Sequence, residues 1–363
     1  MITDIDIRKK LAHDAPQNDK ELYRYIRDIL GFAIPTKAVM PENSSPFKFL
    51  SDLFFERVAD CVVLANRKGG KTRCLSILHH LNSLFKKGCW TTSVGAIDRQ
   101  AQRAYDYLQE YTNYEKNKDN NISILYKDDI IRTIKSETTY KNGSKVEILP
   151  GTLNQVSGPH PQKAILDEVE KSTWEIVQQF IGMPHSAEDI RGQTIFTSTR
   201  ETSFGTMQRL LDRAKRIEMI IYRWSIWETM KKCPKCEKSK CELWETCQGK
   251  ALESDGYIPK SDVVRLFLMW DKETWEAQAL CQKPSRKGLV YQDFSSANIQ
   301  KYEPDLSKDI WIGFDEGYSE PRVILFAQID GDNLYIFDEI YDCLLYTSPS
   351  PRDLSTSRMP SSA

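Results

Sequence analysis

The chain has 363 residues, of which 40% are apolar, and its formal net charge is −1 at pH 7. This length and composition are typical of a globular protein with two domains, because domains usually hold roughly 100 to 200 residues. No run approaches the roughly 18 apolar residues of a membrane span, and the charged N-terminus lacks the apolar core of a secretory signal. We therefore expect an intracellular protein with no part in a membrane.

The near-zero net charge neither favours nor excludes nucleic acid as a partner, because a local patch matters more than the total. One stretch, 207–250, carries 11 Lys and Arg residues against 6 Asp and Glu residues. A solvated face would also explain such an excess.

The first 45 residues indicate an arm that leads into the main domain. Apolar spacing predicts a helix at about 21–30, and a Pro-, Asn- and Ser-rich stretch at 41–46 then interrupts the pattern. Beyond it, Phe47, Leu50, Phe54 and Val58 recur at helical spacing. A helix packed beside the next strand is expected there.

Residues 65–72 have the pattern of a phosphate-binding loop. They follow the apolar run 61–64, precede a helical pattern that ends at 86–88, and consist of Ala65, Asn66, Arg67, Lys68, Gly69, Gly70, Lys71 and Thr72. Glycines let backbone N–H groups face phosphates, Lys71 can reach the β and γ oxygens, and the Thr72 hydroxyl can ligate Mg²⁺. The helix N-terminus adds its dipole. A surface Gly-Gly turn is the alternative.

Strand and helix patterns alternate after this loop. We expect a strand at 90–94, a helix at about 98–114, strands at 122–126 and 130–134, and a hairpin over 140–149 around Asn142-Gly143. Such alternation predicts an α/β sheet.

A second motif is the apolar run 163–166, which ends in Asp167 and Glu168. A buried strand would deliver both carboxylates to its C-terminal edge, where Asp167 could hold Mg²⁺ and Glu168 could deprotonate an attacking water. By itself this string also fits a strand that runs into a loop. A further strand at 193–197 ends in Thr197, Ser198 and Thr199, which suit a sensor of the γ-phosphate.

These motifs, in this order, resemble the large terminase subunit of tailed bacteriophages. The resemblance rests on 66–72, on the hairpin Asn142-Gly143-Ser144 leading to 149–152, on Ser157-Gly158, on 165–168 and on 197–199. It covers roughly 46–342. It implies an α/β fold: a P-loop NTPase of ASCE type with a mostly parallel sheet and flanking helices, followed by the start of a ribonuclease H-like nuclease domain.

The resemblance also implies a function. It predicts an ATP- and Mg²⁺-dependent motor that packages double-stranded viral DNA in the host cytoplasm, with a nuclease that cuts concatemeric DNA. Partners would be the portal protein of the procapsid and a small terminase subunit, with the chain in a ring of copies. Arg67 matches the arginine that senses or triggers hydrolysis. Two departures are Ala65 in place of the first loop glycine and no upstream glutamine for adenine recognition.

Four cysteines follow: Cys233, Cys236, Cys241 and Cys247. Thiolates at such short spacings can close a tetrahedral Zn²⁺ site, and nearby lysines would favour the thiolate form. An iron–sulfur cluster and a chance group of free thiols are the alternatives.

The last patterned segment consists of three antiparallel strands at 311–338. Their start resembles the terminase nuclease domain, which implies that Asp315 is the first ligand of a Mg²⁺ or Mn²⁺ pair. Asp338 and Glu339 are less suitable second ligands. The Ser-, Thr-, Pro- and Arg-rich tail 343–363 shows no pattern of a buried element. We expect this tail to be disordered and not native to the protein. We also expect the nuclease domain to be truncated and the protein to show little or no DNA cleavage.

The expected domains are an arm at 1–45, an ATPase domain at 46–255 with a cysteine-rich insertion at about 230–250, a helical linker at 256–305, and a partial nuclease domain at 306–342. Two other functions stay open. A helicase of another P-loop family would need a second motor domain, and a scaffold that binds nucleotide and DNA without turnover would have no use for Glu168.

Overall fold

The computed structural model describes residues 5–95, 98–118, 121–187, 189–201, 205–236, 240–283, 298–315, 322–331 and 333–342. The chain divides into two compact units, Met1–Arg286 and Lys287–Ala363, which are described separately. In the described part, no helix combines the length and the apolar content that crossing a membrane requires. The predicted tail at 343–363 lies outside the described residues.

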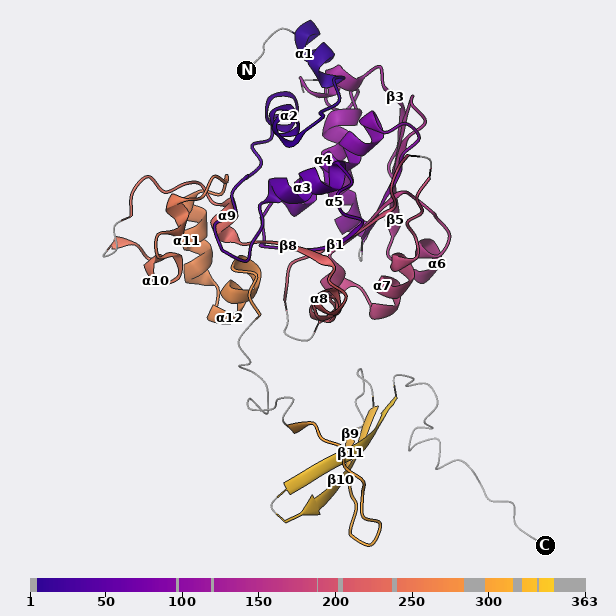
Figure 1. Cartoon of the computed structure of the whole chain (residues 1–363), viewed down its shortest axis with the longest axis vertical. Helices are drawn as coiled ribbons and strands as arrows, with labels where there is room; N and C mark the ends of the chain where they lie inside the picture. Colours follow the sequence, from indigo (N-terminus) through magenta and orange to yellow (C-terminus); the bar gives the residue numbers. More distant parts are fainter. Residues whose placement is uncertain are drawn as a thin grey trace, which may run out of the picture. The chain divides into compact units, whose positions relative to one another are not determined.

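The first unit is built on an eight-stranded sheet with the order β3-β4-β5-β2-β6-β7-β1-β8 (Figure 1). Its strands are β1 Asp60–Ala65, β2 Trp90–Gly95, β3 Ile130–Thr133, β4 Glu137–Tyr140, β5 Lys145–Pro150, β6 Lys163–Asp167, β7 Gln193–Ser198 and β8 Ile220–Trp224. The pairs among β5, β2, β6, β7, β1 and β8 are parallel, and β3 and β4 are antiparallel. The predicted mostly parallel α/β sheet is therefore confirmed.

Helices cover both faces of this sheet. One face is covered by α3 Pro46–Phe54, α4 Lys71–Phe85 and α5 Asp98–Thr112, and the other by α6 Leu153–Val156, α7 Trp174–Ile181 and α8 Thr206–Arg216 (Figure 1). Strand β1 shows why two layers are needed. Its buried side chains alternate, with Val63 in one hydrophobic core and Val62 and Leu64 in the other.

The N-terminal arm contains α1 Ile5–Ala12, α2 Asp19–Arg24 and a π-helical turn, η1 Tyr25–Ile29. The helix predicted at 21–30 is thus present in two parts. In contrast, the strand predicted at 122–126 is wrong, because a 3₁₀ helix, η2 Ser123–Tyr126, lies there. Leu125 and Tyr126 are buried in the core beneath α5, and a short apolar run does not distinguish a strand from a buried helical turn.

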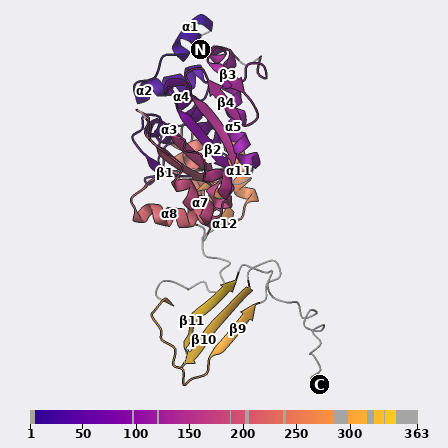
Figure 2. The same ribbon diagram turned by 90° about the vertical axis from the view of Figure 1, so that its right-hand side faces the viewer.

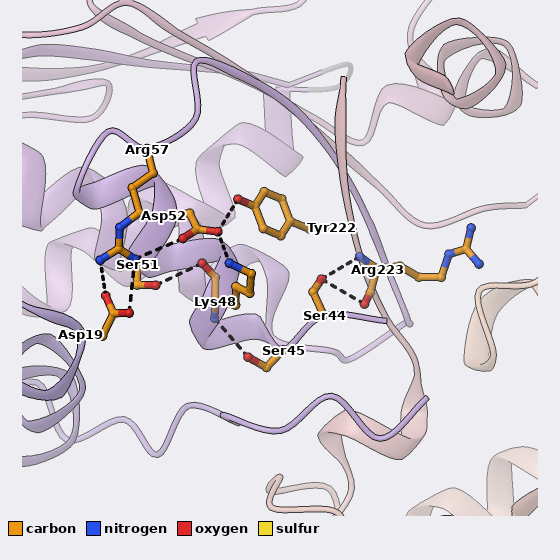
Figure 3. Close-up of polar contacts among 9 residues, drawn as sticks. All are labelled: Asp19, Ser44, Ser45, Lys48, Ser51, Asp52, Arg57, Tyr222 and Arg223. Atoms are coloured by element: carbon orange, nitrogen blue, oxygen red, sulfur yellow. Dashed lines mark hydrogen bonds and ion pairs between the residues drawn. The ribbon is translucent and has the colours of Figure 1, made fainter. Parts of the chain in front are cut away.

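A network around Asp52 fixes α3 against the edge of the sheet (Figure 3). The carboxylate of Asp52 accepts hydrogen bonds from Lys48 (2.8 Å), from Arg57 (3.2 Å) and from the Tyr222 hydroxyl of β8 (2.8 Å). Burial would raise the pKa of Asp52, but these donors outweigh it and lower the pKa below its usual value. Arg57 also pairs with Asp19, so the same network reaches α2.

A smaller helical layer follows β8. It contains α9 Ile226–Thr229, α10 Trp244–Cys247, α11 Lys260–Met269, α12 Lys272–Thr274 and the turns η5 Lys250–Leu252 and η6 Trp275–Ala279. A separate turn, η3 Val169–Lys171, follows β6 and belongs to the main sheet domain. Strand β8 ends at Trp224 because Ser225 and Glu228 form a capping box that starts α9. Helix α11 ends at Met269, and Asp271 then caps α12.

The second unit contains one antiparallel sheet with the order β11-β10-β9 (Figure 2). Its strands are β9 Trp311–Asp315, β10 Arg322–Asp330 and β11 Asn333–Asp342. The three predicted strands are confirmed. Trp311, Ile312 and Phe314 of β9 are exposed.

Candidate nucleotide-binding site

The loop between β1 and α4 has a backbone that a phosphate-binding loop requires. Lys68 and Gly70 adopt left-handed conformations, with φ of 64° and 76°. A Cβ atom added to Gly69 would lie 2.2 Å from the side-chain oxygen of Asn66, and one added to Gly70 would lie 2.4 Å from the Tyr257 hydroxyl. Gly69 is therefore restricted to glycine by Asn66, whose backbone oxygen would also lie 2.8 Å from the added Cβ, and Gly70 by its left-handed backbone.

Asn66 connects this loop to the helical layer. It is buried, and its side-chain amide donates to the hydroxyl of Thr229 (3.1 Å). The indole N–H of Trp224 donates to the carbonyl oxygen of Gly69 (2.9 Å). The loop is thus held by α9 and β8 before any ligand binds.

Lys71 lies between the two carboxylates that the sequence predicts. Its Nζ atom is 2.9 Å from Glu168 Oε1 and 3.3 Å from Asp167 Oδ1. Burial would lower the pKa of Lys71, but the carboxylates of Asp167 and Glu168 outweigh it and raise the pKa above its usual value. A charged Lys71 is therefore ready to bind phosphate oxygens.

The two carboxylates differ in their surroundings. Asp167 is buried at the end of β6, and its Oδ1 atom accepts hydrogen bonds from the Glu168 N–H (2.9 Å) and from the Thr197 hydroxyl. Glu168 has a side chain that is 25% exposed, and its backbone is left-handed, with φ of 57°. Such strain in a residue other than glycine is found most often at functional sites.

The three hydroxyl side chains at the end of β7 have different surroundings. Thr197 bonds Asp167, whereas the buried Ser198 accepts a hydrogen bond from the backbone N–H of Glu170 (3.2 Å). Only Thr199 lines the cavity above the loop. The structure therefore brings Thr199 into reach of a ligand and gives Thr197 and Ser198 supporting contacts.

Arg67 is held by a part of the chain far away in sequence. Its backbone N–H donates to the carbonyl of Gln278 (2.8 Å), and its Nε–H donates to the Gln278 side chain (2.5 Å). Its guanidinium also lies 3.7 Å from Glu201, which pairs with Lys171. Arg67 lines the same cavity, where its predicted role as a trigger stays a prediction.

One cavity of about 1020 Å³ joins these groups. It is lined by Asn66, Arg67, Lys68, Gly69, Gly70, Lys71, Thr72, Glu168 and Thr199, and by residues that the sequence did not single out: Phe32, Arg73, Arg103, Asp106, Tyr107, Glu110, Lys171, Glu201 and Tyr257. Lys171 and Glu201 follow closely after motifs and could have been included. No local pattern connects Phe32 or Tyr257 to the loop.

Comparison with known proteins supports this fold. The structure matches the HK97 bacteriophage large terminase with a TM-score of 0.51 and 15% sequence identity, over 88% of this chain and 67% of that one. This chain has the fold of a phage large terminase. Neither a protein-family profile nor a curated protein matches the sequence.

Two structures of the large terminase from the thermophilic bacteriophage D6E are also similar. One has 11% identity over 82% of this chain and 67% of that chain, with a TM-score of 0.47. Another, a complex with ATP-gamma-S, has 12% identity over 82% and 66%, with a TM-score of 0.43. This chain therefore spans about two thirds of the length of the terminases it resembles.

The four cysteines of the insertion lie around one cavity of about 140 Å³. All cysteines in the described residues are free thiols. Burial raises the pKa of Cys233 above its usual value, so the predicted preference for the thiolate form does not hold for this residue. Within the described ranges, no group of three or more His, Cys, Asp or Glu side chains is arranged to hold a metal ion.

Asp315, the predicted nuclease ligand, lies at the end of β9 in the second unit and is exposed. It pairs in register with Val323 of β10. Asp338 and Glu339 are in β11, on the far side of β10. The role of Asp315 as a nuclease metal ligand stays a prediction.

Proposed function

We propose that this chain is an ATP-hydrolysing motor subunit that translocates double-stranded viral DNA into a procapsid. The observation that carries the proposal is the convergence of Lys71, Thr72, Glu168 and Thr199 on one cavity at the ends of neighbouring parallel strands. The terminase fold supplies the packaging context. A portal protein, a small terminase subunit and a ring of copies belong to the same proposal.

The residues at the site suit Mg²⁺ and a nucleoside triphosphate. The Thr72 hydroxyl and the Asp167 carboxylate offer the oxygen ligands that Mg²⁺ prefers. When bound, the ion neutralises charge on the phosphate oxygens. Lys71 would exchange part of its contact with the carboxylates for the phosphates, which frees Glu168 to accept a proton.

Glu168 is the candidate general base. It is partly exposed to the cavity, so a water molecule can reach it, and Asp167 fixes its backbone through the 2.9 Å hydrogen bond. Thr199 faces the same space and can orient the water or a phosphate oxygen. Arg67, once released from Gln278, can stabilise the charge that develops on the transferred phosphoryl group.

The proposal predicts Mg²⁺-dependent release of phosphate from ATP that double-stranded DNA stimulates. The measurement is phosphate release by the full chain with and without linear duplex DNA. Absence of turnover in both conditions would favour a scaffold. Separation of the strands of a forked duplex, measured in parallel, would favour a helicase.

In the same reactions, any DNA cleavage should disappear with Asp315→Ala, because that residue is proposed as the first metal ligand of the nuclease.

A Zn²⁺ ion held by Cys233, Cys236, Cys241 and Cys247 is the second part of the proposal. It is supported by the shared cavity, although the thiols would have to move closer together around an ion. Metal analysis of the purified chain should find about one Zn²⁺ per chain, lost in Cys233→Ser with Cys236→Ser. The matched control is Cys89→Ser, a buried thiol elsewhere. A metal-free wild-type chain would contradict this part.

A further inference from the structure

The cavity above the phosphate-binding loop is lined by two groups of side chains. One group contains Glu168 and Thr199 together with Lys171 and Glu201, which pair with each other. The other group contains the rings of Phe32, Tyr107 and Tyr257 together with Arg73. The charged residues Arg103, Asp106 and Glu110 share α5 with Tyr107 and line the same cavity. We call Phe32, Tyr107, Tyr257 and Arg73 the aromatic end. Lys71 and Thr72 lie in the loop and helix start that line the same cavity.

The direction of a bound nucleotide follows from this arrangement. The γ-phosphate must lie beside the base Glu168 and beside Thr199, because hydrolysis takes place there. The part of the nucleotide beyond the α-phosphate then extends away from Glu168. The aromatic end lines the same cavity, so the ribose and base would lie against it.

The aromatic end is fixed to the loop itself. The Tyr257 hydroxyl donates to the carbonyl oxygen of Lys68 (3.2 Å), and a Cβ atom added to Gly70 would lie 2.4 Å from it. The ring of Phe32 packs against that of Tyr257, with ring centroids 5.9 Å apart. Phe32 belongs to the N-terminal arm and Tyr257 to the helical layer, and both line the cavity at the loop.

Arg73 provides a planar cation at the same end. It directly follows Thr72, and its guanidinium donates to Glu110 (2.5 Å). It lies 4.9 Å from the ring centroid of Tyr107 and 5.9 Å from that of Phe32. Aromatic rings and guanidinium planes are the groups on which nucleobases stack in proteins.

We infer that the aromatic end binds the nucleobase of the nucleotide, by stacking on Phe32 and Tyr107 beside Arg73, with Tyr257 as the support that positions Phe32. This inference rests on the proposed function, since it concerns the base of the same nucleotide. It assigns base binding to rings rather than to a glutamine upstream of the loop. Stacking recognises the π-face of the base and leaves the phosphates to Lys71 and Thr72.

The test compares two ligands that differ only by the nucleoside. Binding of a non-hydrolysable ATP analogue and of inorganic tripolyphosphate is measured by calorimetry with Mg²⁺, for the wild-type full chain and for Phe32→Leu with Tyr107→Leu. The leucines keep apolar volume, so the fold should persist, which circular dichroism checks. We expect the analogue to bind the variant about tenfold or more weakly, and tripolyphosphate to bind it unchanged.

Tyr114→Leu is the matched control, because Tyr114 is an aromatic residue outside this cavity and contacts Lys127 instead. Equal losses for both ligands in the double variant, or no loss for either, would overturn the base-binding assignment while the phosphate site stands. A wild-type chain that binds neither ligand would overturn the proposed function together with this inference. If the double variant misfolds, the single variant Tyr107→Leu is tested with the same two ligands and the same criteria. Tyr107 is chosen because it is 40% exposed, so its replacement should disturb the fold little.

Discussion

Replacement of Glu168 by glutamine should lower the rate of ATP hydrolysis by about 100-fold or more, while ATP still binds. The amide cannot accept the proton of the attacking water. It can still accept the hydrogen bond that Lys71 donates to this side chain at 2.9 Å, so the loop keeps its support. The measurements are the turnover rate under saturating Mg²⁺–ATP and the dissociation constant for a non-hydrolysable analogue.

Glu175→Gln is the matched control, because it makes the same change on an exposed position of α7. It should leave turnover unchanged. Equal rates in Glu168→Gln and in the wild type would mean that Glu168 is not the base, and the motor proposal would lose its main chemical support. Weaker binding with an unchanged rate constant would assign Glu168 to nucleotide binding instead.

Acid should destabilise the first unit between about pH 6.5 and pH 5, because α4 contains two buried histidines. Burial lowers the pKa of His79 to about 4 and that of His80 to about 3. Among the residues that the structure describes, the Nε2 atoms of both rings have no hydrogen-bond partner. His79 Nδ1 contacts the Thr91 hydroxyl (2.7 Å), and His80 lies among the rings of Tyr111, Tyr126 and Tyr140.

The direction of this change in stability follows from proton binding. Below the unfolded value of 6.5, the unfolded chain binds protons at both histidines while the folded chain does not, so the free energy of unfolding falls as the pH falls. At pH 5 each histidine should account for about 2 kcal/mol of lost stability relative to pH 7.5. Buried carboxylates such as Asp52, whose pKa is lowered, lose their contribution only at lower pH.

Urea unfolding at pH 7.5, 6.5, 5.5 and 5.0 measures this effect. The variant His79→Leu with His80→Phe should show a much smaller loss of stability over this range than the wild type. His160→Gln, at an exposed position, is the control and should behave as the wild type. The pKa of His13 is raised, so this residue stabilises the folded chain as the pH falls and opposes the effect of His79 and His80. The loss of stability of each variant is therefore compared with that of the wild type. Parallel pH curves for wild type and double variant would show that these histidines are not the cause.

Features that depend on neighbouring residues could be predicted from the amino-acid sequence. The phosphate-binding loop, the strand ending in Asp167 and Glu168, and the hydroxyl residues at 197–199 each lie within one short segment with a distinctive pattern. Parallel strands bring their carboxyl ends to one edge of a sheet. The order of these segments was therefore sufficient to predict the α/β fold and to place the loop and both carboxylates at the same edge of the sheet, but not the ion pairs of Lys71 with both carboxylates.

The identity of the groups that surround that centre depends on the tertiary structure. Phe32, Tyr257 and Gln278 approach the loop from distant parts of the chain, and no spacing in the sequence records such contacts. The tertiary structure also shows that Ser198 supports the backbone of Glu170 while Thr199 faces the cavity. The short run at 122–126 became helical because burial beneath α5 outweighed its strand-like composition. Local patterns indicate the chemistry and most element types, whereas packing between distant segments determines short buried elements and which side chains complete the site.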